Sequence, residues 1–463
     1  MSSISKKVDE FKDDIIESTR ELVKIRSVEG EPKDGKPFGE EVNTALEKAL
    51  DISQKLGFKT VNMNGYIGYA EYGEGEDYVA VLGHLDVVPE GNGWKYPPYA
   101  AEIHDGKMYG RGTMDDKSPI VAALYGLKAI KDLDIKLSKR VRIIFGTNEE
   151  TGCHEMEYYN KREKDPVAGF TPDAEYPIVH AEKGITIFDF DKELKVNNSA
   201  VNIEYINGGD RPNMVPDYCE CRISSKELEA LKNAIGKFIS ENSYDIEYEV
   251  DGDSIVIKSR GLAAHGSLPE LGKNSIMQMF KLLGTLPIEK SDIGEYIEFF
   301  NKHVGFETSG ESFGIGIKDE ESGKLTFNVG KISMDKDRVT ISVNVRYPVT
   351  YDYDKVMNEI ENRLKGTQIE IKNMMHQKPL YFPKDHPLIK SLQRVYTEQT
   401  GLEAKLLAIG GGTYAKEMAN IVGFGPILPG EPDLDHQTNE YVKLEDLILN
   451  AKIYANAIYE LAK

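Results

Sequence analysis

The sequence has 463 residues, of which 40% are hydrophobic and 29% charged, and its formal net charge is −20 at pH 7. A globular chain of this length is expected to form two or three folding units. The negative charge argues against nucleic acid and against an anionic membrane as partners. No apolar run approaches the ~20 residues that span a bilayer, and the N-terminus lacks the apolar core of a signal peptide. We therefore expect a cytoplasmic protein.

The N-terminal part of the chain alternates between two hydrophobic patterns. Apolar residues recur at helical spacing in some segments and form short continuous runs in others. Helices are expected at 6–26, 40–56 and 118–131, and strands at 66–72, 78–86 and 140–147. Strands that alternate with helices indicate an α/β layer with a mixed, largely parallel sheet.

From about residue 183 the pattern becomes richer in strands, and helices are expected near 226–240, 274–284 and 352–365. After about residue 378 the first pattern resumes, with helices expected at 387–400 and 443–461. This order predicts an α/β domain interrupted by a large α+β domain, which is long enough for two lobes. The expected boundaries are 1–182, 183–378 and 379–463.

The segment GHLDVVP at 83–89 ends a buried strand with His84 and Asp86. Residues two apart on a strand point to the same face. His84 could therefore bind a metal through one ring nitrogen while Asp86 orients the ring through the other. A core histidine hydrogen-bonded near a strand end is the alternative.

Two further motifs supply carboxylates at the ends of predicted elements. YGRGTMDDKSP at 109–119 places paired aspartates at a helix entrance, where one could bridge two cations or simply cap the helix. FGTNEETG at 145–152 places Glu149 and Glu150 after an apolar strand. Adjacent side chains point in different directions, so one could bind metal while the other handles protons; a solvated surface pair is the alternative.

TPDAEYP at 171–177 and LDHQTNEY at 434–441 each offer one residue able to bind a metal, Asp173 and His436. Taken singly, a turn aspartate and a surface histidine are the simpler interpretations. Taken with the other motifs, they complete a set of imidazoles and carboxylates that suits zinc, manganese or cobalt. A separate glutamate beside such ions could act as a general base.

These motifs, in this order, resemble those of the M20 family of metallopeptidases over essentially the whole chain. The resemblance is greatest to the PepV-like dipeptidases, through TPDAEYP, RPNMVPD and the long insertion. It implies a zinc-peptidase-like α/β catalytic domain with the inserted α+β domain as a lid. It also implies two divalent metal ions, with zinc as the first choice and manganese or cobalt as alternatives.

The resemblance assigns a role to each motif residue. One ion is expected on His84, Asp115 and Asp173, and the other on Asp115, Glu150 and His436. Glu149 becomes the general base that removes a proton from a water shared by the ions, and Asp86 supports His84. The resemblance also implies a cis peptide bond after Asp115, which is rare outside proline.

In the inserted domain, SRGLAAHGSLPE at 259–270 resembles the lid segment whose histidine, here His265, polarises the scissile carbonyl. Asn213 and Arg346 resemble residues that grip a substrate carboxylate, a task suited to a planar guanidinium. A surface-loop histidine and an ordinary ion-pair arginine are the alternatives. The GGGT stretch lacks the ending of a phosphate loop, so Gly411 and Gly412 are expected to approach substrate with their backbone.

Together these features predict a monomeric peptidase whose substrates are small peptides, namely dipeptides. Capture of the C-terminal carboxylate of the substrate would limit the length of the peptide that the enzyme accepts. A deacylase of N-acyl amino acids or a desuccinylase of the same family is the nearest alternative, because the metal centre is shared. An inactive relative that binds metal or peptide is a third. No expected ligand or base is missing from the sequence, which argues against the inactive relative.

Overall fold

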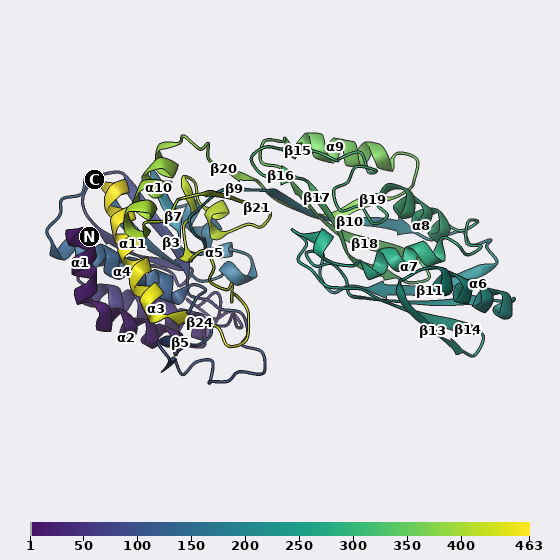
Figure 1. Cartoon of the computed structure of the whole chain (residues 1–463), viewed down its shortest axis with the longest axis horizontal. Coiled ribbons are helices and arrows are strands. Elements are labelled where there is room, and N and C mark those ends of the chain that lie inside the picture. The colour runs from purple at the N-terminus through teal and green to yellow at the C-terminus, as the bar shows by residue number, and fades with distance from the viewer. Residues whose placement is uncertain (1) are drawn as a thin grey trace. The chain divides into compact units, whose positions relative to one another are not determined.

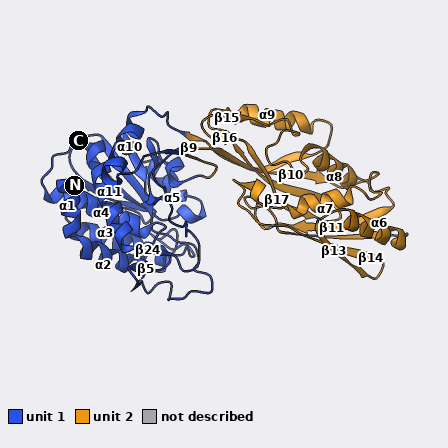
Figure 2. Cartoon of the chain, viewed as in Figure 1, with its two compact units in different colours: residues 1–180, 381–407, 412–463 blue, residues 181–380, 408–411 orange. Residues whose placement is uncertain are grey.

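The computed structural model describes residues 2–463 and divides into two compact units (Figure 2). Unit 1 comprises the chain up to His180 together with Tyr381–Leu407 and Gly412–Lys463. Unit 2 comprises Ala181–Leu380 and the short segment Ala408–Gly411. The second unit is therefore an insertion in the first.

A nine-stranded sheet forms the centre of unit 1 (Figure 1), and its inner strands β6, β3, β7 and β22 are parallel. The strand order along the main path is β1 (Lys59–Met63), β2 (Ile67–Tyr72), β6 (Arg140–Gly146), β3 (Tyr78–His84), β7 (Ala168–Thr171), β22 (Ile421–Gly423), β9 (Ile178–Glu182) and β20 (Leu380–Tyr381), with β21 (Leu406–Ile409) paired to β9. All seven residues of β3 are buried, as a strand covered on both faces requires. Parallel strands end at one edge of a sheet, so β3, β6 and β7 bring the loops that follow them together.

Helices α4 and α11 pack against each other and against β3 and β6. Helix α4 is buried over almost its whole length, which explains why its sequence is apolar on every side. The helices of unit 1 are α1 (Ser3–Glu10), α2 (Lys12–Val23), α3 (Glu40–Lys55), α4 (Lys117–Asp132), α5 (His154–Asn160), α10 (Pro387–Thr400) and α11 (Leu444–Ala462). The remaining strands are β4 (Glu102–His104), β5 (Lys107–Tyr109) and β24 (Tyr441–Lys443) in a small sheet, and the pair β8 (Ala174–Glu175) and β23 (Pro426–Ile427).

The helix expected at 6–26 is two helices, because the backbone of Phe11 leaves helical geometry between α1 and α2. The apolar period continues across this break, so the pattern alone did not reveal it. No helix within residues 2–463 combines the length and apolar character needed to cross a bilayer.

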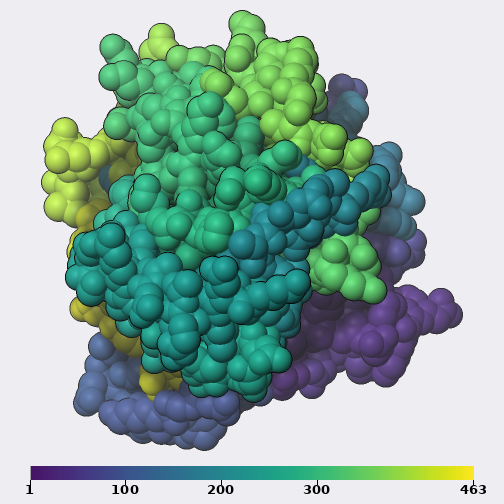
Figure 3. All heavy atoms as spheres, turned by 90° about the vertical axis from the view of Figure 1, so that its right-hand side faces the viewer, coloured from purple at the N-terminus to yellow at the C-terminus, as the bar shows by residue number. Residues whose placement is uncertain are grey.

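Unit 2, whose atoms appear in teal and green in Figure 3, is built on one eight-stranded antiparallel sheet. Its order is β13 (Asp245–Asp251), β14 (Ser254–Arg260), β12 (Tyr218–Ser225), β11 (Val201–Gly208), β17 (Thr326–Met334), β18 (Arg338–Tyr347), β10 (Gly184–Glu193) and β19 (Glu370–Gln377). A small hairpin of β15 (Lys318–Asp319) and β16 (Gly323–Lys324) lies outside it. The register between β11 and β17 joins only Ile206–Gly208 to Ile332–Met334, so two four-stranded halves meet there.

Burial alternates along β12, with Cys219, Cys221 and Ile223 on the buried face. Such alternation is typical of an antiparallel sheet covered on one side. The buried residues belong to one core that also takes in α6 (Leu228–Glu241), α7 (Ser275–Leu283), α8 (Asp292–His303) and α9 (Tyr353–Leu364). The mixed, largely parallel sheet and the inserted α+β unit confirm the expected fold class.

Candidate metal centre

His84 is the last residue of β3 and is fully buried. Its Nδ1 donates to the backbone carbonyl of Asp86 at 3.0 Å, which leaves Nε2 as the atom able to bind a metal. Nε2 lies 2.7 Å from Oδ1 of Asp115. The preceding Gly83 is required here, because a Cβ at that position would stand 2.2 Å from the Asp116 carboxylate.

Asp86 acts on its surroundings through two different groups. Its carbonyl orients the His84 ring, and its Oδ1 lies 3.5 Å from the same ring nitrogen. Its carboxylate accepts the backbone N–H groups of Glu149 at 3.2 Å and Glu150 at 3.1 Å. Asp86 therefore connects the loop after β3 with the loop after β6.

Asp115 faces two imidazoles, with Oδ1 at His84 and Oδ2 3.3 Å from Nε2 of His436. The peptide bond between Asp115 and Asp116 is cis, as the family resemblance implied. Asp116 turns the other way, and its Oδ2 accepts the backbone N–H of His84 at 3.2 Å. Of the two aspartates, Asp115 is therefore the one whose carboxylate faces both imidazoles.

His436 completes the centre from the C-terminal part of the chain. Its Nε2 lies 2.9 Å from Oε2 of Glu150, and its side chain is 54% exposed, so this side of the centre is open. Hydrogen bonds to Asp115 and Glu150 raise the pKa of His436 to about 11 in the absence of cations.

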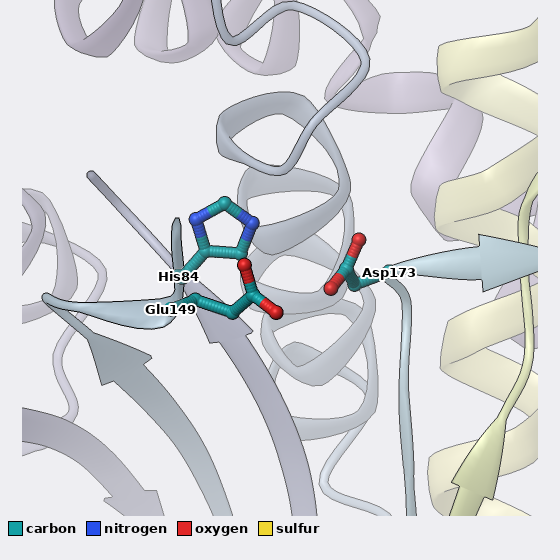
Figure 4. A group of neighbouring side chains, drawn as sticks. All are labelled: His84, Glu149 and Asp173. Atoms are coloured by element: carbon teal, nitrogen blue, oxygen red, sulfur yellow. The ribbon is translucent and has the colours of Figure 1, made fainter. Parts of the chain in front are cut away.

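Potential ligand atoms gather in two groups within 4.8 Å, His84 with Asp115 and Glu150, and His84 with Glu149 and Asp173. Figure 4 shows the second group, whose three side chains reach into one space from separate segments. Asp173 lies two residues after the last residue of β7. This grouping places Glu149 beside Asp173, whereas the sequence prediction placed Asp115 there and reserved Glu149 for proton transfer.

The carboxylates of the centre are crowded. Burial raises the pKa of Glu149 well above its usual range, and Asp173 adds to the effect. Burial and Asp115 raise the pKa of Glu150 and bring that of Asp173 to about 7. Although burial opposes its ionisation, the imidazoles of His84 and His436 lower the pKa of Asp115. Cations bound among these oxygens would relieve the repulsion, so the donor set fits divalent ions that accept both imidazole and carboxylate.

The sequence prediction missed Glu440 and Arg111, which are buried beside the centre and form an ion pair at 2.7 Å. Glu440 belongs to the same LDHQTNEY motif as His436, four residues later. Its position just before a strand was the one available signal. Asp435, in the same motif, was also missed; burial and the charge of Asp115 raise its pKa to about 9.

The remaining predicted residues, except Gly412, lie in unit 2. Nδ1 of His265 lies 2.6 Å from the hydroxyl of Ser267 and 3.4 Å from the backbone nitrogen of the same residue, and Nη2 of Arg346 faces Nε2 at 3.5 Å. Burial and Arg346 lower the pKa of His265, which keeps the ring neutral. The carbonyl of Asn213 accepts the backbone N–H of Gly266 at 2.7 Å, and this joins the segments of Asn213 and His265.

Arg346 is 4% exposed and donates to the Asn344 side chain at 2.9 Å and to the carbonyl of Gly410 at 2.6 Å. Burial lowers its pKa to about 10, and within residues 2–463 no carboxylate forms an ion pair with it. A Cβ at Gly410 would meet Ser267 at 2.9 Å, so this glycine allows the GGGT segment to approach the His265 loop. The next residue, Gly411, lies beside the same guanidinium.

Known proteins resemble this chain over nearly its whole length. The sequence model of Peptidase family M20/M25/M40 matches residues 80–460. A Bacillus subtilis (strain 168) protein named "Putative dipeptidase YtjP" is 38% identical over 459 residues, 98% of each chain. A Staphylococcus epidermidis (strain ATCC 12228 / FDA PCI 1200) protein named "Putative dipeptidase" is 34% identical over 463 residues, also 98% of each chain.

Two solved structures share the fold at low sequence identity. Human carnosine dipeptidase 1 is 17% identical with a TM-score of 0.57, and the match covers 99% of each chain. Aminopeptidase PepT from Bacillus cereus ATCC 10987 is 16% identical with a TM-score of 0.58, covering 98% of this chain and 99% of that one. Because the family match spans most of the sequence and the relatives match at full length, the chain belongs to peptidase family M20/M25/M40 and is a metallopeptidase.

Proposed function

We propose that this metallopeptidase hydrolyses dipeptides at a dinuclear metal centre, with Glu149 as the general base. The observation that carries the proposal is the convergence of two imidazoles and four carboxylates from five separate segments of unit 1, namely His84, Asp115, Glu149, Glu150, Asp173 and His436. The dipeptidase names of the full-length relatives support the same substrate class.

The metal-binding roles follow from the ligand types. Asp115 is the residue to share between two ions, because its two carboxylate oxygens face different imidazoles. Zinc is the first choice and manganese or cobalt the alternatives, since all three accept mixed imidazole and carboxylate ligands. When bound, the ions would supply Lewis acidity and lower the pKa of water at the centre.

Glu149 is held by its backbone N–H, so its carboxylate is left for chemistry. It removes a proton from the attacking water and later delivers that proton to the leaving amine. His265 is the residue that polarises the scissile carbonyl and stabilises the negative charge that develops on its oxygen. Asp173 is a candidate partner for the free amino end of the substrate.

Arg346 accounts for the limit on substrate length. A buried guanidinium without a carboxylate partner in the described chain is suited to bind a carboxylate that arrives with the substrate. Asn213 and the backbone of Gly411 and Gly412 are expected to contribute further hydrogen bonds. Capture of the C-terminal carboxylate one residue beyond the scissile bond would favour dipeptides over longer peptides.

The test is hydrolysis of a plain dipeptide beside the matched tripeptide and N-acetyl amino acid, with chelator-stripped enzyme before and after addition of Zn²⁺ or Mn²⁺. Metal-dependent cleavage of the dipeptide alone is the expected result. Cleavage of the acetylated compound instead would move the protein to the deacylases. Failure to cleave any of the three, with metal restored, would contradict the peptidase assignment.

We also propose that the protein is a monomer. The edge strand β13 of unit 2 carries Asp245, Glu247, Glu249 and Asp251. Charged residues on an edge strand oppose pairing with a second sheet. Light scattering is expected to give the mass of one 51.9 kDa chain, and a dimer mass would contradict this proposal.

A further inference from the structure

Glu440 immediately precedes β24, and its side chain is completely buried. Its Oε1 accepts the backbone N–H groups of Met114 at 2.7 Å and Asp115 at 3.3 Å. Its Oε2 accepts from Nη1 of Arg111 at 2.7 Å and from the backbone N–H of Gly112 at 3.1 Å. One carboxylate thus binds the loop that ends at the bridging aspartate.

Arg111 extends this contact to the second ligand loop. Its Nη1 pairs with Glu440, and its Nη2 donates to the backbone carbonyl of His436 at 3.2 Å. The loops that carry Asp115 and His436 are therefore joined through one buried ion pair. His436 has a φ of 62°, a left-handed conformation that a residue with a side chain rarely adopts without support from its surroundings.

The chemistry of the contact requires a carboxylate. Both oxygens of Glu440 face N–H donors, two on each side. A glutamine has one oxygen and one NH₂ group, so either orientation of the amide would turn donors toward donors. Substitution by glutamine should therefore disturb the loop although the side chain keeps its size.

We propose that Glu440 is a positioning residue for the metal centre. Its carboxylate holds Asp115 and His436 at the separation that they need to share an ion. This inference rests on the proposed function, since it concerns the ion between these two ligands. Glu440 touches neither the reacting atoms nor the ligand side chains, and it acts through the backbone of Met114 and Asp115 and through Arg111. Loss of such a supporting contact typically reduces metal affinity by roughly 10–100-fold.

The test is calorimetric titration of metal-free protein with Mn²⁺ or Zn²⁺, with the visible spectrum of the Co²⁺ form as a second readout. E440Q is expected to weaken the binding of one of the two ions by roughly 10–100-fold and to change the Co²⁺ spectrum. D191N is the matched control. Asp191 is also a buried carboxylate, paired with Arg338 and Lys372, but it belongs to unit 2, whereas the proposed ligands belong to unit 1.

D191N should lower thermal stability while both ions bind with wild-type affinity. E440D provides a second variant if E440Q does not fold; it keeps the charge but is one methylene too short to reach all four donors, so weaker metal binding is expected again. If either folded Glu440 variant binds both ions like the wild type, the inference is overturned while the proposed function stands. If the wild type itself takes up fewer than two ions, the proposed dinuclear centre fails first.

Discussion

The carboxylate of Asp86 accepts the backbone N–H of Glu149 at 3.2 Å. Its other oxygen accepts the N–H of Glu150 at 3.1 Å, and its carbonyl orients the ring of His84. One aspartate therefore sets the backbone of two adjacent glutamates and the ring of a histidine. This arrangement allows Glu149 and Glu150 to project differently while neither side chain is needed for support.

The first prediction concerns this relationship. D86N keeps the shape of the side chain, but its NH₂ group must face one of the two backbone N–H groups. We expect kcat to fall by roughly 10–100-fold, the usual effect of losing a contact that orients catalytic or metal-binding groups. Steady-state kinetics with a dipeptide, together with metal content by elemental analysis, measures it. A D86N enzyme with wild-type kcat would show that the loop after β6 holds its geometry without Asp86.

The second prediction separates proton transfer from metal binding. E149Q should lose at least about 10²–10⁴-fold in kcat, since the amide cannot remove a proton, and should retain close to the wild-type metal content. H84A should lose metal as well as activity, because His84 belongs to both ligand groups. The two variants are compared by metal analysis after the same dialysis. An active E149Q enzyme would mean that another group is the base, and metal loss in E149Q would assign Glu149 to the ligands.

The sequence predicted most of the fold because its patterns are local. Helix α10 lies where the apolar period placed it, and β3 follows the continuous apolar run around residue 80. Strand β13, by contrast, was not predicted. Its exposed residues are acidic and its position is set by pairing with β14, so little of it appears as an apolar pattern.

Within the site, side chains that follow strands could be read from the sequence, whereas contacts to backbone could not. Asp115 and Asp116 are equivalent by pattern, and only the resemblance to the family distinguished them; in the structure, Asp116 binds the backbone of His84 and Asp115 faces the imidazoles. Glu440 shows the same limit. Its partners include the backbone N–H of Asp115, 325 residues away in sequence, and a backbone group leaves no trace in residue type.

The third prediction concerns Arg346. Replacement by methionine in R346M removes the guanidinium proposed to bind the substrate carboxylate. Charge-assisted hydrogen bonds contribute about 1.5–3 kcal/mol, so kcat/KM for a dipeptide should fall by roughly 10–100-fold. The loss should appear mainly in KM.

Two controls make this test specific. The dipeptide amide lacks the carboxylate, so R346M and wild type should cleave it at similar rates. R338M removes an arginine from the same strand, but Arg338 is paired with Asp191, and kcat/KM should therefore stay unchanged. Equal losses on the acid and the amide would show that Arg346 supports the fold of unit 2 rather than recognition of the carboxylate.

The fourth prediction uses Glu155, a fully buried residue of α5 whose Oε1 accepts from the hydroxyl of Tyr414. Its Oε2 has no hydrogen-bond partner among the residues that the structure describes. Burial, with a contribution from Asp86, raises its pKa from 4.5 to about 7. The folded state therefore holds the proton more tightly than the unfolded state.

Because the folded pKa is the higher one, the stabilising contribution is complete below pH 4.5 and is lost as pH rises through about 7. The shift corresponds to a change on the order of 3 kcal/mol in the free energy of unfolding. E155Q cannot titrate, so the difference in stability between E155Q and wild type should change by this amount between pH 4.5 and 8. Urea unfolding across this pH range, with both proteins stripped of metal by a chelator, measures this difference. E157Q removes an exposed glutamate from the same helix, and its free energy of unfolding should depend on pH as that of the wild type does. If the free energy of unfolding of E155Q also followed the wild-type pH dependence, Glu155 would have an ordinary affinity for its proton in the folded protein.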